Sequence, residues 1–133
     1  GQQNSAEEGF AQMDWASANG INFFDTAELY PSRPTADTQG RTEEIIGEWF
    51  TRTGKRADII LASKVTGPED GFNWIRGGVS RFTESSIRKA IEGSLRRLQT
   101  DYIDLYMNHA VNDVARVASE AWFQSDIVWL NAT

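Results

Sequence analysis

Short apolar runs alternate with helix-like patterns along this chain, and that alternation limits its fold more than any other feature. In the helix-like segments, apolar residues recur every three or four positions. The apolar runs are short and continuous, which is typical of strands covered on both faces of a parallel sheet. Strands that alternate with helices pair in parallel through right-handed crossovers. The sequence therefore predicts an α/β fold of four helix–strand units with parallel strands.

The boundaries of these units follow from residues that begin or end helices. Ser5 and Glu8 form a capping-box pattern before the first helix, and Gly20 and Gly54 suit the left-handed position that follows a helix. Helices are predicted over 6–18, 42–52, 83–99 and a stretch after Asn112, and strands over 21–25, 58–65, 102–107 and 127–130.

Length and composition place the chain among ordinary globular proteins. Its 133 residues are 40% hydrophobic and 24% charged, which suits one domain with a real core. A complete eight-stranded α/β barrel needs ~250 residues, so the predicted units make up only part of such a barrel.

Charge and cysteine content exclude several classes of partner and site. A net charge of −6 argues against nucleic acid or an anionic membrane as the main partner. No apolar run approaches the ~18–20 residues of a membrane span, and the polar start GQQNSAEEGF lacks the basic residues of a signal peptide. The chain has no cysteine, which excludes disulfides and cysteine-based zinc sites and is compatible with a cytoplasmic location.

Polar residues follow the predicted strands at the end where α/β barrels carry their working groups. Asp25 ends the first strand, with Glu28 and Tyr30 just beyond it, Lys64 lies near the end of the second, and His109 follows the third. A charged group at the end of an apolar strand needs a partner, so we expect Asp25 and Lys64 to pair. Glu28 is expected to be a solvated loop acid.

Four stretches of sequence carry a resemblance to a known family. They are Gly20–Tyr30 (GINFFDTAELY), Gly40–Gly47 (GRTEEIIG), Leu61–Val65 (LASKV) and Leu95–Tyr106 (LRRLQTDYIDLY) followed by His109. In this order they are similar to the motifs of aldo-keto reductases, and most similar to the bacterial and fungal NADP(H)-dependent branch. The resemblance covers residues 1–110 as a partial barrel, and leaves residues 111–133 as an unmatched helix and possible strand of the same domain.

The resemblance implies a catalytic set of Asp25, Tyr30, Lys64 and His109. Tyr30 would protonate the carbonyl oxygen of a small substrate while a nicotinamide, NADP(H), delivers hydride. Lys64 would lower the pKa of the Tyr30 phenol, and Asp25 would hold Lys64 in place. His109 would orient the carbonyl through a hydrogen bond.

The chain also departs from the family pattern. The glycine-rich strand before the first helix and the second half of the barrel, which supplies most cofactor contacts, have no counterpart here, and Ala110 stands where the family has Trp. The expected fold is thus a truncated, half TIM-type barrel, and no cofactor-binding residue can be assigned. Four strands cannot close a barrel, so we expect two copies to complete it as a homodimer.

Three functions stay open from the sequence. The first is NADP(H)-dependent carbonyl reduction. The second is hydrolysis of an ester or phosphate, with a metal held by Asp25, Glu28 or His109, although the spacing forms no metal motif. The third is a non-catalytic, self-associating barrel fragment. The glycine-rich loop 66–82 is either a substrate lid or a loop without function, and Arg96 and Arg97 are expected to lie on a solvated helix end.

Overall fold

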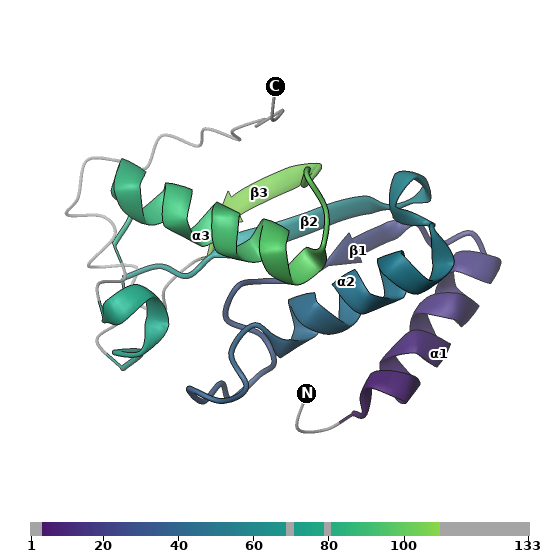
Figure 1. Cartoon of the computed structure of the whole chain (residues 1–133), viewed down its shortest axis with the longest axis horizontal. Coiled ribbons are helices and arrows are strands. Elements are labelled where there is room, and N and C mark those ends of the chain that lie inside the picture. Colours follow the sequence, from purple (N-terminus) through teal and green to yellow (C-terminus); the bar gives the residue numbers. More distant parts are fainter. Residues whose placement is uncertain (1–3, 69–70, 79–80, 110–133) are drawn as a thin grey trace.

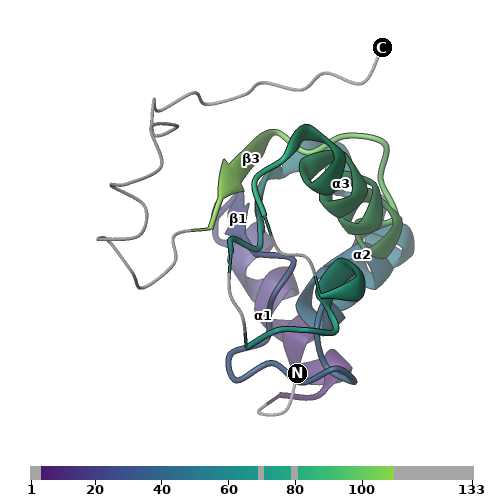
Figure 2. The same ribbon diagram turned by 90° about the vertical axis from the view of Figure 1, so that its left-hand side faces the viewer.

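The computed structural model describes residues 4–68, 71–78 and 81–109. In these residues three parallel strands form one sheet in the order β1 (Phe23–Asp25), β2 (Ile60–Val65) and β3 (Leu105–Asn108). They alternate with α1 (Ala6–Ala18), α2 (Arg41–Thr53) and α3 (Glu84–Leu98), and short 3-10 turns occur at η1 (Arg56–Asp58) and η2 (Ile75–Gly77). The helices α2 and α3 lie on one face of the sheet, and α1 packs beside α2 (Figures 1 and 2).

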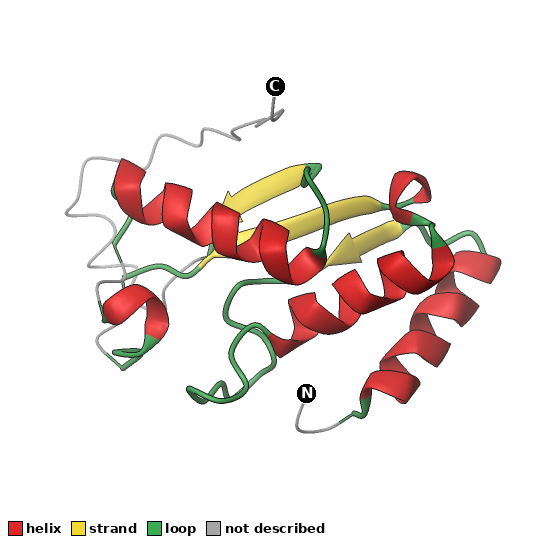
Figure 3. Ribbon diagram, in the orientation of Figure 1, coloured by secondary structure: helices red, strands yellow, loops and turns green. Residues whose placement is uncertain are grey.

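The predicted α/β order with parallel strands is confirmed in three helix–strand units (Figure 3). The fourth predicted helix and strand lie outside the described residues. The second strand begins later than predicted because residues 56–58 form η1, whose Arg56 side chain donates to the Ile59 carbonyl at 2.8 Å. The third strand begins at Leu105 because the Asp104 carboxylate accepts the Leu61 N–H at 2.8 Å.

The helix ends follow the capping residues of the sequence. At the start of α1, the Glu8 N–H donates to the Ser5 hydroxyl and the Ser5 N–H donates to the Glu8 carboxylate, which completes the predicted capping box. Gly54 ends α2 with a φ of 68°, a left-handed conformation that favours glycine. Thr83 caps α3 by accepting the Ser86 N–H.

Alternate residues of the strands point into the core between sheet and helices. Phe24, Leu61, Val65 and Tyr106 are buried there, together with the apolar face of α2. Phe23 and Ile60, which are paired in register across β1 and β2, are 50% and 45% exposed. The described residues therefore cover the sheet on one face, whereas the sequence pattern predicts cover on both.

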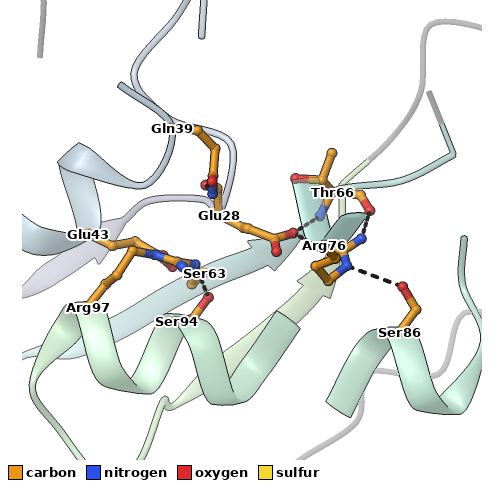
Figure 4. Close-up of polar contacts among 9 residues, drawn as sticks. All are labelled: Glu28, Gln39, Glu43, Ser63, Thr66, Arg76, Ser86, Ser94 and Arg97. Atoms are coloured by element: carbon orange, nitrogen blue, oxygen red, sulfur yellow. Dashed lines mark hydrogen bonds and ion pairs between the residues drawn. The ribbon is translucent and has the colours of Figure 1, made fainter. Parts of the chain in front are cut away.

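A buried ion pair joins both sheet-covering helices to the central strand. Glu43 on α2 is completely buried; Arg97 on α3 donates to its carboxylate at 2.7 Å, and Ser63 on β2 donates at 2.6 Å (Figure 4). Arg96 is exposed as expected, but the prediction that Arg97 is solvated is wrong. Arg97 lies across the helix interface because Gly47 lets α3 approach α2, and a Cβ at Gly47 would lie 2.3 Å from the Arg97 carbonyl.

Candidate active site

The four residues predicted to form the site converge at the carboxyl ends of the strands. Asp25 is the last residue of β1, Lys64 lies on β2, and His109 follows β3 directly. The His109 N–H donates to the Val65 carbonyl at 3.0 Å, so the sheet pairing places this residue. Tyr30 lies in the loop between β1 and α2. One edge of the sheet therefore carries a carboxylate, an ammonium, a phenol and an imidazole.

Asp25 and Lys64 form the predicted pair. The Lys64 Nζ lies 2.7 Å from each Asp25 carboxylate oxygen and donates a third bond to the Thr26 carbonyl at 2.8 Å. The Lys64 side chain is 15% exposed, and Asp25 is 47% exposed. Because an ammonium has three hydrogen-bond donors, these contacts fix its position completely. The expected pairing of these two residues is confirmed.

Tyr30 lies between Lys64 and His109. The Lys64 Nζ is 5.3 Å from the centroid of the Tyr30 ring, within the range of a cation–π contact. The Tyr30 and His109 rings meet edge to face, with centroids 5.7 Å apart and planes at 79°. Hydrogen bonds hold both polar groups of the Tyr30 backbone: its N–H donates to the Ala27 carbonyl, and its carbonyl accepts the Gly40 N–H.

The surroundings of His109 favour the neutral form of its imidazole. Burial lowers the pKa of its imidazole, the positive charge of Lys64 lowers it further, and Asp25 acts in the opposite direction. Its Nδ1 is buried and has no hydrogen-bond partner among the described residues. A neutral imidazole carries one N–H, and a proton on Nε2 avoids a buried donor without a partner. His109 is thus suited to donate a hydrogen bond from Nε2.

Tyr30 and His109 line an open cavity of about 520 Å³. The remaining walls come from the loop after β1 and the start of α2, with the residues Leu29, Pro31, Ser32, Arg33, Pro34 and Thr42. The volume lies within the range typical of small-molecule sites. The cavity therefore has room for a small molecule beside the phenol and imidazole groups.

Glu28 differs from its prediction. Its side chain is buried rather than solvated, and its Oε2 accepts bonds from the Arg76 guanidinium and from the Thr66 N–H at 2.8 Å (Figure 4). The signals in the sequence were an acid three positions after the end of a predicted strand and an arginine followed by Gly77 and Gly78. Neither signal says that the two residues meet, since they are separated by 48 positions.

Two of the three candidate ligands of the metal-assisted alternative are paired with cationic side chains in this arrangement. Asp25 is occupied by Lys64, and Glu28 is occupied by Arg76. Within residues 4–68, 71–78 and 81–109, no group of three metal-ligating acid, histidine or cysteine side chains occurs.

In the same ranges, no helix has the length and apolar character needed to cross a membrane.

Comparison with known proteins identifies the family. The model of the Aldo/keto reductase family matches residues 1–124 of this chain. The chain belongs to the aldo/keto reductase family. Among its relatives, Protein tas of Escherichia coli is 45% identical over 109 residues, which are 82% of this chain and 32% of that protein. The uncharacterized oxidoreductase YrpG of Bacillus subtilis is 45% identical over 108 residues, covering 77% of this chain and 31% of that protein.

Solved structures of aldo-keto reductases share the fold. A putative aldo-keto reductase from Pseudomonas aeruginosa is 28% identical with a TM-score of 0.64, over 88% of this chain and 40% of that one. The holo form of aldo-keto reductase AKR11C1 from Bacillus halodurans is 34% identical with a TM-score of 0.62, over 84% of this chain and 35% of that one. The partial barrel expected from the sequence is therefore confirmed.

The match to the family covers only part of this chain and only part of its relatives. This chain spans about a third of the length of the curated relatives it matches. The family model extends to residue 124, which lies beyond the position near 110 where the resemblance in the sequence ends.

Proposed function

We propose that this chain carries the proton-donating side of an NADP(H)-dependent reductase of small carbonyl compounds. The observation that supports this most directly is the convergence of Asp25, Lys64, Tyr30 and His109 at one sheet edge, two of them beside an open cavity. Each residue type matches the role that the family resemblance implies for it.

In the proposed reaction, the Tyr30 hydroxyl gives its proton to the carbonyl oxygen of the substrate. His109 donates a hydrogen bond from Nε2 to the same oxygen and turns the carbonyl toward Tyr30. Its neutral form suits this role because a neutral donor adds no second positive charge beside Lys64. Lys64 places its ammonium against the Tyr30 ring, and Asp25 keeps that ammonium fixed.

The described residues fit the carbonyl end of this reaction better than the cofactor end. A bound NADPH would supply the hydride. Its phosphates need basic side chains or a loop of free backbone N–H groups. Within the described part of the chain, the guanidinium groups of Arg76 and Arg97 are already paired with Glu28 and Glu43, and Arg33 is a basic side chain in the wall of the cavity. The proposed cofactor therefore needs contacts besides those of Arg76 and Arg97.

The experiment is an assay of this chain with NADPH and a small aromatic aldehyde, in which Tyr30→Phe removes only the proton donor. We expect the rate of NADPH oxidation to fall ~10²–10⁴-fold, the range of general acid catalysis. Quenching of NADPH fluorescence should be unchanged, because the phenyl ring still fills the site. An equal rate of oxidation in Tyr30→Phe and the native chain would exclude the proposed role.

A second candidate is a non-catalytic, self-associating barrel fragment. It is favoured by the exposed apolar pair Phe23 and Ile60 on the face of the sheet that the described residues leave open. The same assay separates the candidates, because a non-catalytic chain gives no oxidation of NADPH above the background without protein. The absence of cysteine is compatible with the cytoplasm as the proposed location of either.

A further inference from the structure

Behind the site, a buried ion pair connects two loops that lie far apart in the sequence. Glu28 belongs to the loop between β1 and α2, and Arg76 belongs to η2 in the loop between β2 and α3. Their side chains are 3% and 9% exposed. We propose that Glu28, held by Arg76, is a positioning residue that fixes Tyr30 against Lys64 and His109.

The first support is the pair of hydrogen bonds between Glu28 and the end of β2. Its N–H donates to the Lys64 carbonyl at 3.0 Å, and its carboxylate accepts the Thr66 N–H at 2.8 Å. Backbone and side chain of one residue thus hold the strand on both sides of Val65. Because Tyr30 lies only two positions later, a shift of Glu28 moves the phenol relative to Lys64.

The second support is the contact on the other side of the loop. The Gln39 side chain donates to the Glu28 carbonyl at 2.6 Å, and the Gly40 N–H donates to the Tyr30 carbonyl at 2.9 Å. These bonds tie the loop to the start of α2. Glu28 is the residue at which the attachments to α2, β2 and η2 meet (Figure 4).

The third support is the geometry of Arg76. One guanidinium binds the Glu28 carboxylate, the Thr66 carbonyl at 3.1 Å and the Ser86 hydroxyl at 3.2 Å. Arg76 adopts φ 48° and ψ 34°, a left-handed conformation that is strained for a side chain of this size. A buried ion pair adds little stability over an apolar pair of similar volume. The strain and burial of Arg76 therefore favour a role in positioning neighbouring residues. Strained residues of this kind are common beside functional sites.

The inference rests on the proposed function only for its kinetic test. Glu28→Gln keeps an oxygen for the Thr66 N–H and removes the charge that binds Arg76. The matched control is Glu84→Gln, which makes the same change in the exposed Glu84–Arg88 pair on α3. Arg76→Lys keeps the positive charge but lacks the planar guanidinium that binds Glu28, Thr66 and Ser86 together, and it replaces Glu28→Gln if that variant does not fold.

Two measurements follow the position of Tyr30. His109 is the single histidine of the chain, so nuclear Overhauser cross-peaks between its imidazole and the assigned ring protons of Tyr30, one of three tyrosines, report their contact. We expect these cross-peaks in the native chain and in Glu84→Gln, and their loss or strong weakening in Glu28→Gln and Arg76→Lys. In the NADPH assay we expect kcat to fall ~10²-fold in both site variants with KM little changed, because misplacement of a reacting group has about that effect.

The outcomes are distinguishable. If the native chain does not oxidise NADPH but the cross-peaks depend on Glu28 and Arg76, the proposed function fails and the positioning role stands. If Glu28→Gln or Arg76→Lys folds and retains the native cross-peaks and kcat, the positioning role is overturned and the proposed function stands. Absence of the cross-peaks from the native chain would also overturn the inference.

Discussion

At the scale of single residues, the role proposed for His109 requires an uncharged imidazole. Burial and the charge of Lys64 hold the pKa of His109 below its ordinary value of 6.5. The unfolded chain therefore takes up the proton first as pH falls. The contribution of His109 to the free energy of unfolding is complete above pH 6.5. It decreases as the pH falls through the lower pKa that the imidazole has in the folded chain.

This behaviour gives a pH prediction. Titration of the His109 imidazole by NMR should give a midpoint below 6.5 in the folded native chain. Lys64→Met should raise the midpoint, because it removes the nearby positive charge, and Asp25→Asn should lower it, because it removes the opposing negative one. A midpoint that does not respond to Lys64→Met would contradict the electrostatic contact between the two residues.

At the scale of elements, the Glu43–Arg97 pair decides how α2 and α3 pack on β2. Removing one partner of a buried pair leaves an uncompensated charge, which costs more than the pair itself contributes. Glu43 is the more sensitive partner, because it is completely buried and Arg97 is 22% exposed.

The matched prediction compares adjacent arginines. Arg97→Met should lower the free energy of unfolding in urea by about 3–5 kcal/mol, because Glu43 then lacks its cation. Arg96→Met, at the exposed neighbouring position, should change it by less than about 0.5 kcal/mol. Equal losses in the two variants would mean that the Glu43–Arg97 contact does not stabilise the interface of the two helices.

At the scale of the whole molecule, the exposed face of the sheet is the dominant feature. Phe23 and Ile60 lie on it in register, and in the described part of the chain β1 and β3 each pair on one side only. Unpaired strand edges and contiguous apolar surface favour association. We propose that a second copy of this chain covers the face, with the two copies related by a two-fold axis.

Light scattering after size-exclusion chromatography tests the assembly. We expect a mass of twice the 14.9 kDa of one chain. Phe23→Ser with Ile60→Ser should shift the protein toward the monomer, since both changes replace exposed apolar surface without altering the core. A compact native monomer at micromolar concentration would exclude the proposed homodimer.

The sequence by itself determined the order and type of the described α-helices and strands. Apolar spacing and caps act over a few residues, so the helix at 6–18 and the strands that end near Asp25 and Lys64 could be predicted from local pattern. The rule that parallel strands carry working groups at their carboxyl ends then grouped Asp25, Lys64 and His109. Strand starts were less accurate, because η1 and the Asp104 side chain compete with strand pairing there.

Only the tertiary structure decided which charges are buried and with which partners. Glu28 and Arg97 look like solvated residues in the sequence, yet each is paired with a charge 48 or 54 positions away. The stability of such a residue depends on whether an opposite charge arrives from another element, and local pattern contains no such information. The three-dimensional packing of α2, β2, η2 and α3 supplies those partners.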